Sequence, residues 1–228
     1  MNNSMTKPAI AEFLGTFTLV FIGAAAVTLA GMMPAESVGP LAVTVPALAH
    51  GLALVIIVMV YGHISGAHVN PAVTVGLLVG GKITLNRAIV YWIAQFVGAI
   101  VAALAISALV PAGTNLGVTT GSLTADNVLT AAAWEFILTF LLVSSVYQAA
   151  VYGKAGNVAG LAIGLTLAAC IFAGGPYTGA SLNPARTLGP ALIAGDLSYV
   201  PAYLIGIFAG GIAAGLLHTY VLAPDPVK

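Results

Sequence analysis

The pattern of apolar positions divides the chain into long and short apolar stretches. Six long stretches cover residues 9–30, 41–62, 87–109, 128–151, 157–175 and 199–222. A helix needs about 20 apolar residues to cross the roughly 30 Å hydrocarbon core of a bilayer. The pattern therefore predicts an all-α membrane protein with six transmembrane helices.

Two short apolar stretches, residues 70–80 and 183–193, remain between the long ones. A helix over either of them would be only about 16 Å long, which is half the thickness of the hydrocarbon core. Both stretches are too apolar for a loop in water. We therefore expect two re-entrant half-helices, each of which enters the bilayer and stops inside it.

Polar residues inside the apolar pattern fall at corresponding places in the two halves of the chain. Glu12 in "EFLGTF" corresponds to Glu135 in "EFILTF", and Asn70 in "SGAHVNPAVT" corresponds to Asn183 in "TGASLNPART". This correspondence predicts an internal repeat.

The repeat divides residues 1–228, which we expect to form a single membrane domain, into copies at residues 1–110 and 127–228. Each copy holds three predicted spans, so the second copy enters the membrane from the opposite side. Inverted repeats with broken helices carry their functional site near the bilayer midplane, where the copies meet.

The composition identifies lipid as the solvent of most of the surface. Hydrophobic residues make up 60% of the chain and charged residues 5%, against about 25% charged residues in an ordinary globular protein. The formal net charge is zero, so no nucleic-acid partner is expected. The single cysteine, Cys170, excludes an internal disulfide and a cysteine-based metal cluster, and the sequence predicts no metal or other cofactor.

The basic residues orient the chain, since cytoplasmic loops are enriched in Lys and Arg. With both termini in the cytoplasm, five of the six basic residues lie on the cytoplasmic side and three acidic residues outside. These are Lys7, Lys82, Arg87, Lys154 and Lys228 inside, and Glu36, Asp126 and Asp196 outside. We expect a multi-pass protein of the cell (plasma or inner) membrane, with the vacuolar membrane as the alternative.

The repeated Asn-Pro-Ala tripeptides have the chemistry of a helix start. Asn is a favoured N-cap and Pro is favoured at the first helical position. The capping oxygen faces the helix, so the amide NH₂ is left as a donor that points away from it. We expect the six residues of these motifs to line a pore at the midplane: Asn70, Pro71, Ala72, Asn183, Pro184 and Ala185.

The residues that lead into each motif cannot be helical if the half-helices begin at the asparagines. Irregular backbone at membrane depth is tolerated where it lines a cavity or is buried in protein. We therefore expect backbone carbonyls along a narrow aqueous path, from Gly66, Ala67, His68 and Val69 in the first copy and Gly179, Ala180, Ser181 and Leu182 in the second.

The paired motifs "GHISGAHVNPAVT" and "SLNPART" resemble those of the aquaporins, the major intrinsic proteins, and the resemblance covers essentially the whole chain. It implies six spanning helices with two half-helices and a pore in each subunit. It also implies passive passage of water or other small neutral solutes, exclusion of protons and ions, and a homotetramer in a lipid bilayer.

The family resemblance also implies a selectivity filter toward the outside. By motif spacing it consists of His50, Ile171, Ala180 and Arg186. This set is most similar to the tonoplast intrinsic proteins of plants. Thr187 and Ala191 stand where glycerol facilitators carry an aspartate and a basic residue, so the chain does not resemble those facilitators.

The filter favours a second permeant besides water. Ile171 stands where strict water channels of the family usually carry a histidine, and Ala180 is small. The resulting filter is wider and less polar on one side, so we expect ammonia to pass with water and glycerol to pass poorly. A channel mainly for ammonia or other small neutral solutes is the alternative.

Glu12 and Glu135 are ionisable groups inside predicted spans. Such groups are functional candidates by default, as in the proton relay of a secondary transporter. Their duplication favours a structural role, in which each carboxylate accepts hydrogen bonds from a re-entrant loop. A transporter would also need a titratable group at the central site, where this chain has the neutral side chains of Asn70 and Asn183.

An intramembrane serine protease is a further alternative, with Ser181 in "GAS" as the nucleophile and His218 as the base. Nucleophile and base must lie within hydrogen-bond reach. The sequence places His218 near the cytoplasmic side and Ser181 at the outer approach to the midplane. The duplicated Asn-Pro-Ala motif would also have no role in such an enzyme.

Overall fold

A computed structural model describes residues 3–34, 39 and 41–225 of the chain. Its α-helices are α1 (Asn3–Met32), α3 (Leu41–Ser65), α4 (Pro71–Val79), α5 (Leu85–Leu109), α6 (Ser122–Asp126), α7 (Val128–Val146), α8 (Ala159–Thr178), α9 (Pro184–Ala194) and α10 (Val200–Tyr220). The orientation argument also used Glu36 and Lys228, which lie outside the described residues.

The six predicted spans are confirmed, because six helices in the described part of the chain are long and apolar enough to cross a membrane. Their lipid-facing sides are apolar, and large side chains such as Met59, Leu129 and Ile205 are at least 68% exposed. The half-helices α4 and α9 have 9 and 11 residues. The fold class expected from the sequence is therefore the observed one.

Two details differ from the expected helices. Residues 128–151 do not form one α-helix, because α7 gives way to a π-helix, η1 (Tyr147–Val151). The wider turn places Tyr147 and Gln148 against neighbouring elements: the Tyr147 hydroxyl donates to Gly76 O at 2.9 Å, and Gln148 Nε2 lies 3.1 Å from His218 Nδ1. The short helix α6 was also not expected, and it lies between the predicted spans 87–109 and 128–151.

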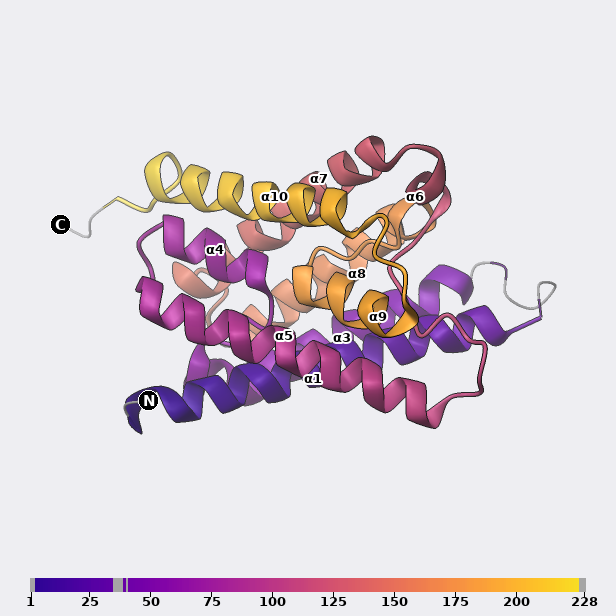
Figure 1. Ribbon diagram of the computed structural model, residues 1–228. Coiled ribbons are helices and arrows are strands. Elements are labelled where there is room, and N and C mark those ends of the chain that lie inside the picture. The colour runs from indigo at the N-terminus through magenta and orange to yellow at the C-terminus, as the bar shows by residue number, and fades with distance from the viewer. Residues whose placement is uncertain (1–2, 35–38, 40, 226–228) are drawn as a thin grey trace.

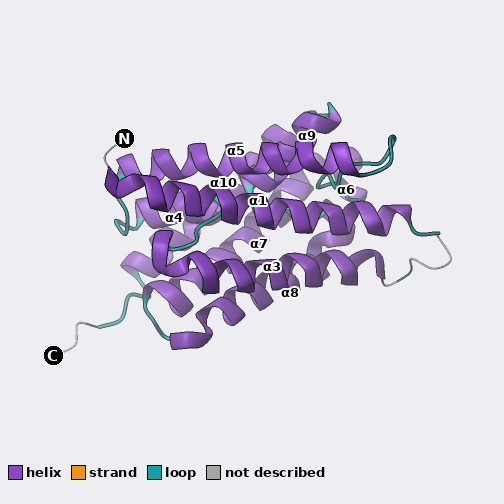
Figure 2. Cartoon of the chain, turned by 90° about the horizontal axis from the view of Figure 1, so that it is seen from below, coloured by secondary structure: helices purple, strands orange, loops and turns teal. Residues whose placement is uncertain are grey.

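The six spans form a ring in the order α5, α1, α3, α8, α7, α10, in which each helix packs on the next. The half-helices complete the ring between α5 and α10, because α4 and α9 both contact these two spans. Figures 1 and 2 show that α1 begins and α10 ends at the same end of the bundle. The start of the first span and the end of the last therefore lie on the same side of the membrane.

The two half-helices run in opposite directions from the middle of the bundle. In Figure 1, α4 occupies the left half of the molecule and α9 the right half. Their first turns face each other, and the two helices contact each other at this point. The positive ends of two helix dipoles thus lie together inside the protein.

Close approach of α3 and α8 depends on paired glycines. A Cβ on Gly51 would lie 2.8 Å from Gly164 O, and a Cβ on Gly164 would lie 2.5 Å from Gly51 O. Small residues that let backbones meet are typical of helix pairs in membranes. This contact joins two of the helices that carry expected filter residues, His50 on α3 and Ile171 on α8.

Candidate functional site: a channel between the half-helices

Both half-helices begin at an asparagine N-cap. Asn70 Oδ1 accepts from Ala72 N at 2.8 Å, and Asn183 Oδ1 accepts from Ala185 N at 3.0 Å and from Arg186 N at 3.3 Å. Pro71 and Pro184 occupy the first helical positions, where no N–H is needed.

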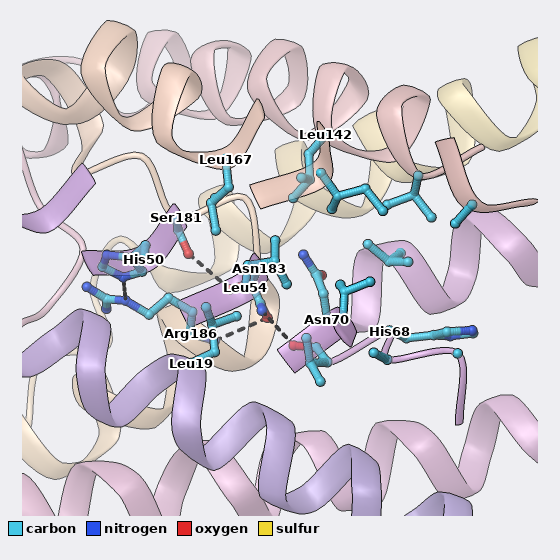
Figure 3. Close-up of a pocket in the computed structure, with 18 residues that line it drawn as sticks. Leu19, His50, Leu54, His68, Asn70, Leu142, Leu167, Ser181, Asn183 and Arg186 are labelled. Atoms are coloured by element: carbon cyan, nitrogen blue, oxygen red, sulfur yellow. Dashed lines mark hydrogen bonds between the residues drawn. The ribbon is translucent and has the colours of Figure 1, made fainter. Parts of the chain in front are cut away.

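The two asparagine side chains are cross-connected. Asn70 Nδ2 donates to Leu182 O at 2.8 Å, and Asn183 Nδ2 donates to Val69 O at 2.9 Å. Each half-helix start is therefore bonded to the loop that leads into the other half-helix. Both asparagines are buried, and Figure 3 shows them between the two ends of a cavity.

The loops before the half-helices share an unusual backbone conformation. Positive φ angles occur at Ala67 (47°), Val69 (42°), Ala180 (44°) and Leu182 (56°), and also at Gly66 and Gly179. Non-glycine residues rarely adopt positive φ, and for a β-branched valine it is an outlier. Such strain costs on the order of 1–3 kcal/mol per residue, so the surroundings must hold these loops in place.

Glu12 supplies part of that support for the first loop. Its Oε1 accepts from Ser65 Oγ at 2.6 Å and from His68 N at 2.9 Å. Its Oε2 accepts from Val69 N at 2.7 Å and from Gln95 Nε2 at 2.7 Å. All four partners donate to the carboxylate, which is 0% exposed.

Glu135 holds the second loop in the same manner. Its Oε1 accepts from Thr178 Oγ1 at 2.7 Å and from Ser181 N at 2.9 Å, and its Oε2 accepts from Leu182 N at 2.8 Å. It has one donor fewer than Glu12, because Ile207 occupies the position that corresponds to Gln95. Both carboxylates thus accept hydrogen bonds from backbone N–H groups of the strained loops.

His50 and Arg186 are hydrogen-bonded to each other. Arg186 Nε donates to His50 Nε2 at 3.1 Å, and His50 Nδ1 lies 2.8 Å from Pro46 O. A carbonyl only accepts, so Nδ1 carries the proton and Nε2 is the acceptor. The geometry assigns a neutral His50 in its Nδ1–H tautomer, with both ring nitrogens engaged by protein.

A cavity of about 40 Å³ runs past these residues. His50 and Arg186 lie at one end and His68 at the other, with the asparagines between them (Figure 3). A water molecule needs at least roughly 10–15 Å³, so this narrow cavity has room for water. Its wall is largely apolar, with Leu19, Leu54, Val58, Val73, Leu142, Val146, Ile163 and Leu167 among the lining residues.

A second cavity of about 290 Å³ is lined by the start of α3, the end of α8, Val27 of α1, and residues 118, 120 and 121, which precede α6. Ile171 and Gly179 line it, whereas His50 and Arg186 line the narrow cavity. Of the four expected filter residues, His50 and Arg186 thus line one cavity, Ile171 lines the other, and Ala180 lines neither.

Only some of the residues whose backbone carbonyls were expected along the aqueous path line a cavity. Residues 66–69 and Ser181 line the narrow cavity, and Gly179 lines the wide one. Ala180 and Leu182 are buried and line neither.

Several polar residues of the site were missed by the sequence analysis. Gln95 Nε2 bonds both Glu12 and Thr74 Oγ1, and the hydroxyl of Tyr91 donates to Ser65 O at 2.6 Å. The repeat offered a signal for some of them, because Ser65 and Thr178 lie 113 positions apart, as do Thr74 and Thr187. This is the same separation as that of the two asparagines.

The protease hypothesis is wrong. Ser181 Oγ bonds Asn183 O at 3.0 Å and Thr187 Oγ1 at 2.6 Å, whereas His218 bonds Gln148 of the π-helix at the end of α7. The proposed nucleophile and base belong to different clusters.

Comparisons with known proteins agree with this architecture. The family model described as "Major intrinsic protein" matches residues 1–218. The chain is 40% identical to "Probable aquaporin TIP2-2" of Oryza sativa subsp. japonica, covering 94% of this chain and 87% of the relative. It is 41% identical to "Probable aquaporin TIP3-2" of Arabidopsis thaliana, covering 96% and 85%.

A solved structure shares the fold. The X-ray structure of the aquaglyceroporin from Plasmodium falciparum superposes with a TM-score of 0.81 at 26% identity, covering 96% of this chain and 98% of that one. The chain therefore belongs to the major intrinsic protein family, the aquaporins, whose members are membrane channels for water and small solutes and not enzymes.

Proposed function

We propose that the protein conducts water, and also ammonia, through the narrow cavity while it excludes protons and ions. The observation that carries the proposal is the reciprocal bonding of Asn70 and Asn183 at the facing starts of two half-helices. The wall of the cavity is largely apolar, and the Asn70 and Asn183 side chains are fixed polar groups in it. Water molecules therefore bind weakly to the protein as they pass.

Proton exclusion follows from the direction of the donors. Each asparagine NH₂ has two N–H groups, and one of them is used in the cross-connection. The other is available to a water, which must then present its oxygen. The helix dipoles at the same point favour the same water orientation, so a continuous proton wire is interrupted.

Cation exclusion is assigned to Arg186 together with the helix dipoles. The guanidinium is 2% exposed and lines the narrow cavity, and its Nη1 has no hydrogen-bond partner in the described part of the chain. Because Nε is held by His50, the rest of the group keeps N–H donors for a permeating molecule. A positive charge at a narrow point repels cations.

Ammonia is included because of Ile171. Its side chain is 3% exposed and lines the wide cavity beside Gly179. A neutral molecule of the size of water, with a single acceptor site, needs few polar partners and tolerates this apolar wall. Glycerol needs more width than a column of single waters.

The test is water flux in proteoliposomes. Purified protein is reconstituted, and shrinkage after an osmotic step is followed by stopped-flow light scattering, with a pH-sensitive dye inside the vesicles. We expect fast shrinkage with a low activation energy and no proton movement. Shrinkage no faster than that of empty vesicles, with incorporation verified, would overturn the proposal.

Assembly and location are part of the same proposal. The exposed apolar faces of the spans allow burial against lipid or further subunits, and family membership supports the homotetramer expected from the sequence. The relatives are named TIP, for tonoplast intrinsic protein, and this name favours the vacuolar membrane over the cell membrane that the sequence analysis placed first.

A further inference from the structure

We propose that Gly23, on α1, determines the permeation properties of the filter by giving the His50 ring the space from which it holds Arg186. The inference rests on the proposed filter and adds a residue to it from a third helix. Gly23 is a positioning residue, because it acts through His50 and bears no side chain of its own.

Two hydrogen bonds fix the orientation of the His50 ring. Its Nδ1–H bonds Pro46 O one turn earlier in α3, and its Nε2 accepts from Arg186 Nε. The ring is 6% exposed. A rotation that moves Nε2 away from Arg186 leaves a buried guanidinium nitrogen without its acceptor.

The edge of the ring that accepts from Arg186 is the edge that lies against Gly23. A Cβ on Gly23 would lie 2.1 Å from His50 Nε2, 2.3 Å from Cδ2 and 2.5 Å from Cε1. Non-bonded carbon atoms prefer separations of about 3.5–4.0 Å. No side chain larger than hydrogen therefore fits at position 23 while the ring keeps its place.

Displacement of the ring affects the narrow cavity directly. His50 and Arg186 both line that cavity, as does Leu19, one turn before Gly23 on α1. A methyl group on residue 23 clashes with the ring edge that accepts from Arg186, so the ring and the guanidinium cannot both keep their places. The lining of the cavity changes at the end where these two side chains lie (Figure 3).

The first measurement is the water permeability of Gly23→Ala and its activation energy in proteoliposomes. We expect the permeability per channel to fall several-fold and the activation energy to rise, because water must pass a filter whose side chains no longer keep their places. A merely structural defect would reduce the number of working channels and leave the activation energy unchanged. An unchanged activation energy overturns the proposal.

Gly31→Ala is the matched control on the same helix. Its added Cβ would have no neighbour closer than Asn115 Nδ2 at 3.7 Å, which is an ordinary contact. We expect permeability and activation energy equal to those of the wild type. The same loss in both variants would mean that any alanine in α1 is harmful, and would also overturn the proposal.

The second measurement uses a His50→Ala background. If Gly23 acts through the ring, Gly23→Ala with His50→Ala should behave as His50→Ala alone. An equal effect of Gly23→Ala in both backgrounds overturns the proposal.

The folding of the two variants and the conduction of the wild type complete the test. If Gly23→Ala does not fold, the double variant should fold, because the clashing ring is gone. A double variant that also fails to fold means that Gly23 serves something other than His50. A wild type that does not conduct overturns the proposed function and this inference together, whereas a conducting wild type with a normal Gly23→Ala overturns only this inference.

Discussion

Replacement of Glu135 by glutamine should destabilise the protein without altering what the channel selects. The carboxylate accepts the Ser181 N–H on Oε1 and the Leu182 N–H on Oε2. A glutamine has only one oxygen, so its NH₂ must face one of these two backbone donors. The backbone N–H cannot turn around, and it loses its acceptor inside the protein.

The size of the effect follows from the unpaired groups. A buried polar group that loses its partner costs about 1–3 kcal/mol, and here the backbone N–H and the new NH₂ both lack an acceptor. The expected loss is thus about 2–6 kcal/mol, which corresponds to a fall in Tm of at least about 4 °C for a chain of this size.

Glu12→Gln is the comparison variant and should cost less. Its NH₂ has a possible acceptor, because Gln95 Oε1 is buried and has no partner in the described residues, and the Gln95 amide can turn to present it. In the second repeat Ile207 stands at that position and accepts nothing.

The assay is thermal unfolding of the purified variants in detergent, with water and proton flux measured on the folded fraction. The Tm should be highest for the wild type, lower for Glu12→Gln and lowest for Glu135→Gln. The water flux per folded channel should be unchanged. A Glu135→Gln protein as stable as the wild type would refute the bonding argument. Normal stability with lost proton-linked transport would favour the transporter instead.

Two further substitutions test the filter. Arg186→Val should raise the flux of urea-sized neutral solutes and admit cations, because it removes the charge and bulk from the narrow cavity; an unchanged solute profile in a folded variant would remove Arg186 from the filter. Ile171→His should slow ammonia more than water, measured as alkalinisation inside dye-loaded vesicles in an ammonium gradient. If vesicles with the wild-type protein show fast water flux but take up ammonia no faster than protein-free vesicles, ammonia is excluded as a permeant.

The spans and the half-helices could be predicted from the sequence because the bilayer fixes the required length of an apolar helix. The N-caps at Asn70 and Asn183 were also accessible, since capping is decided by neighbours within one turn. These features depend on local sequence, and a membrane imposes a single length scale on all of them.

Other features depend on residues that meet only in the folded chain. The tautomer of His50 is set by Pro46 on its own helix and by Arg186 on another, and the role of Gly23 exists only because a ring from α3 lies against it. The π-helix at Tyr147 likewise makes its hydrogen bonds with α4 and α10, which are far away in the sequence. No periodicity along the chain contains this information.

The cross-connection of the asparagines has a consequence for the order in which the protein is made. Asn70 donates to a carbonyl that is synthesised 112 residues later, and Asn183 reaches back 114 residues to Val69. Until the second half of the chain has entered the bilayer, the first half-helix has no partner for its amide and no neighbour for its positive end. Completion of the aqueous path must therefore be among the last events of biogenesis, so a nascent chain held at the translocon does not yet carry an open hole through the membrane.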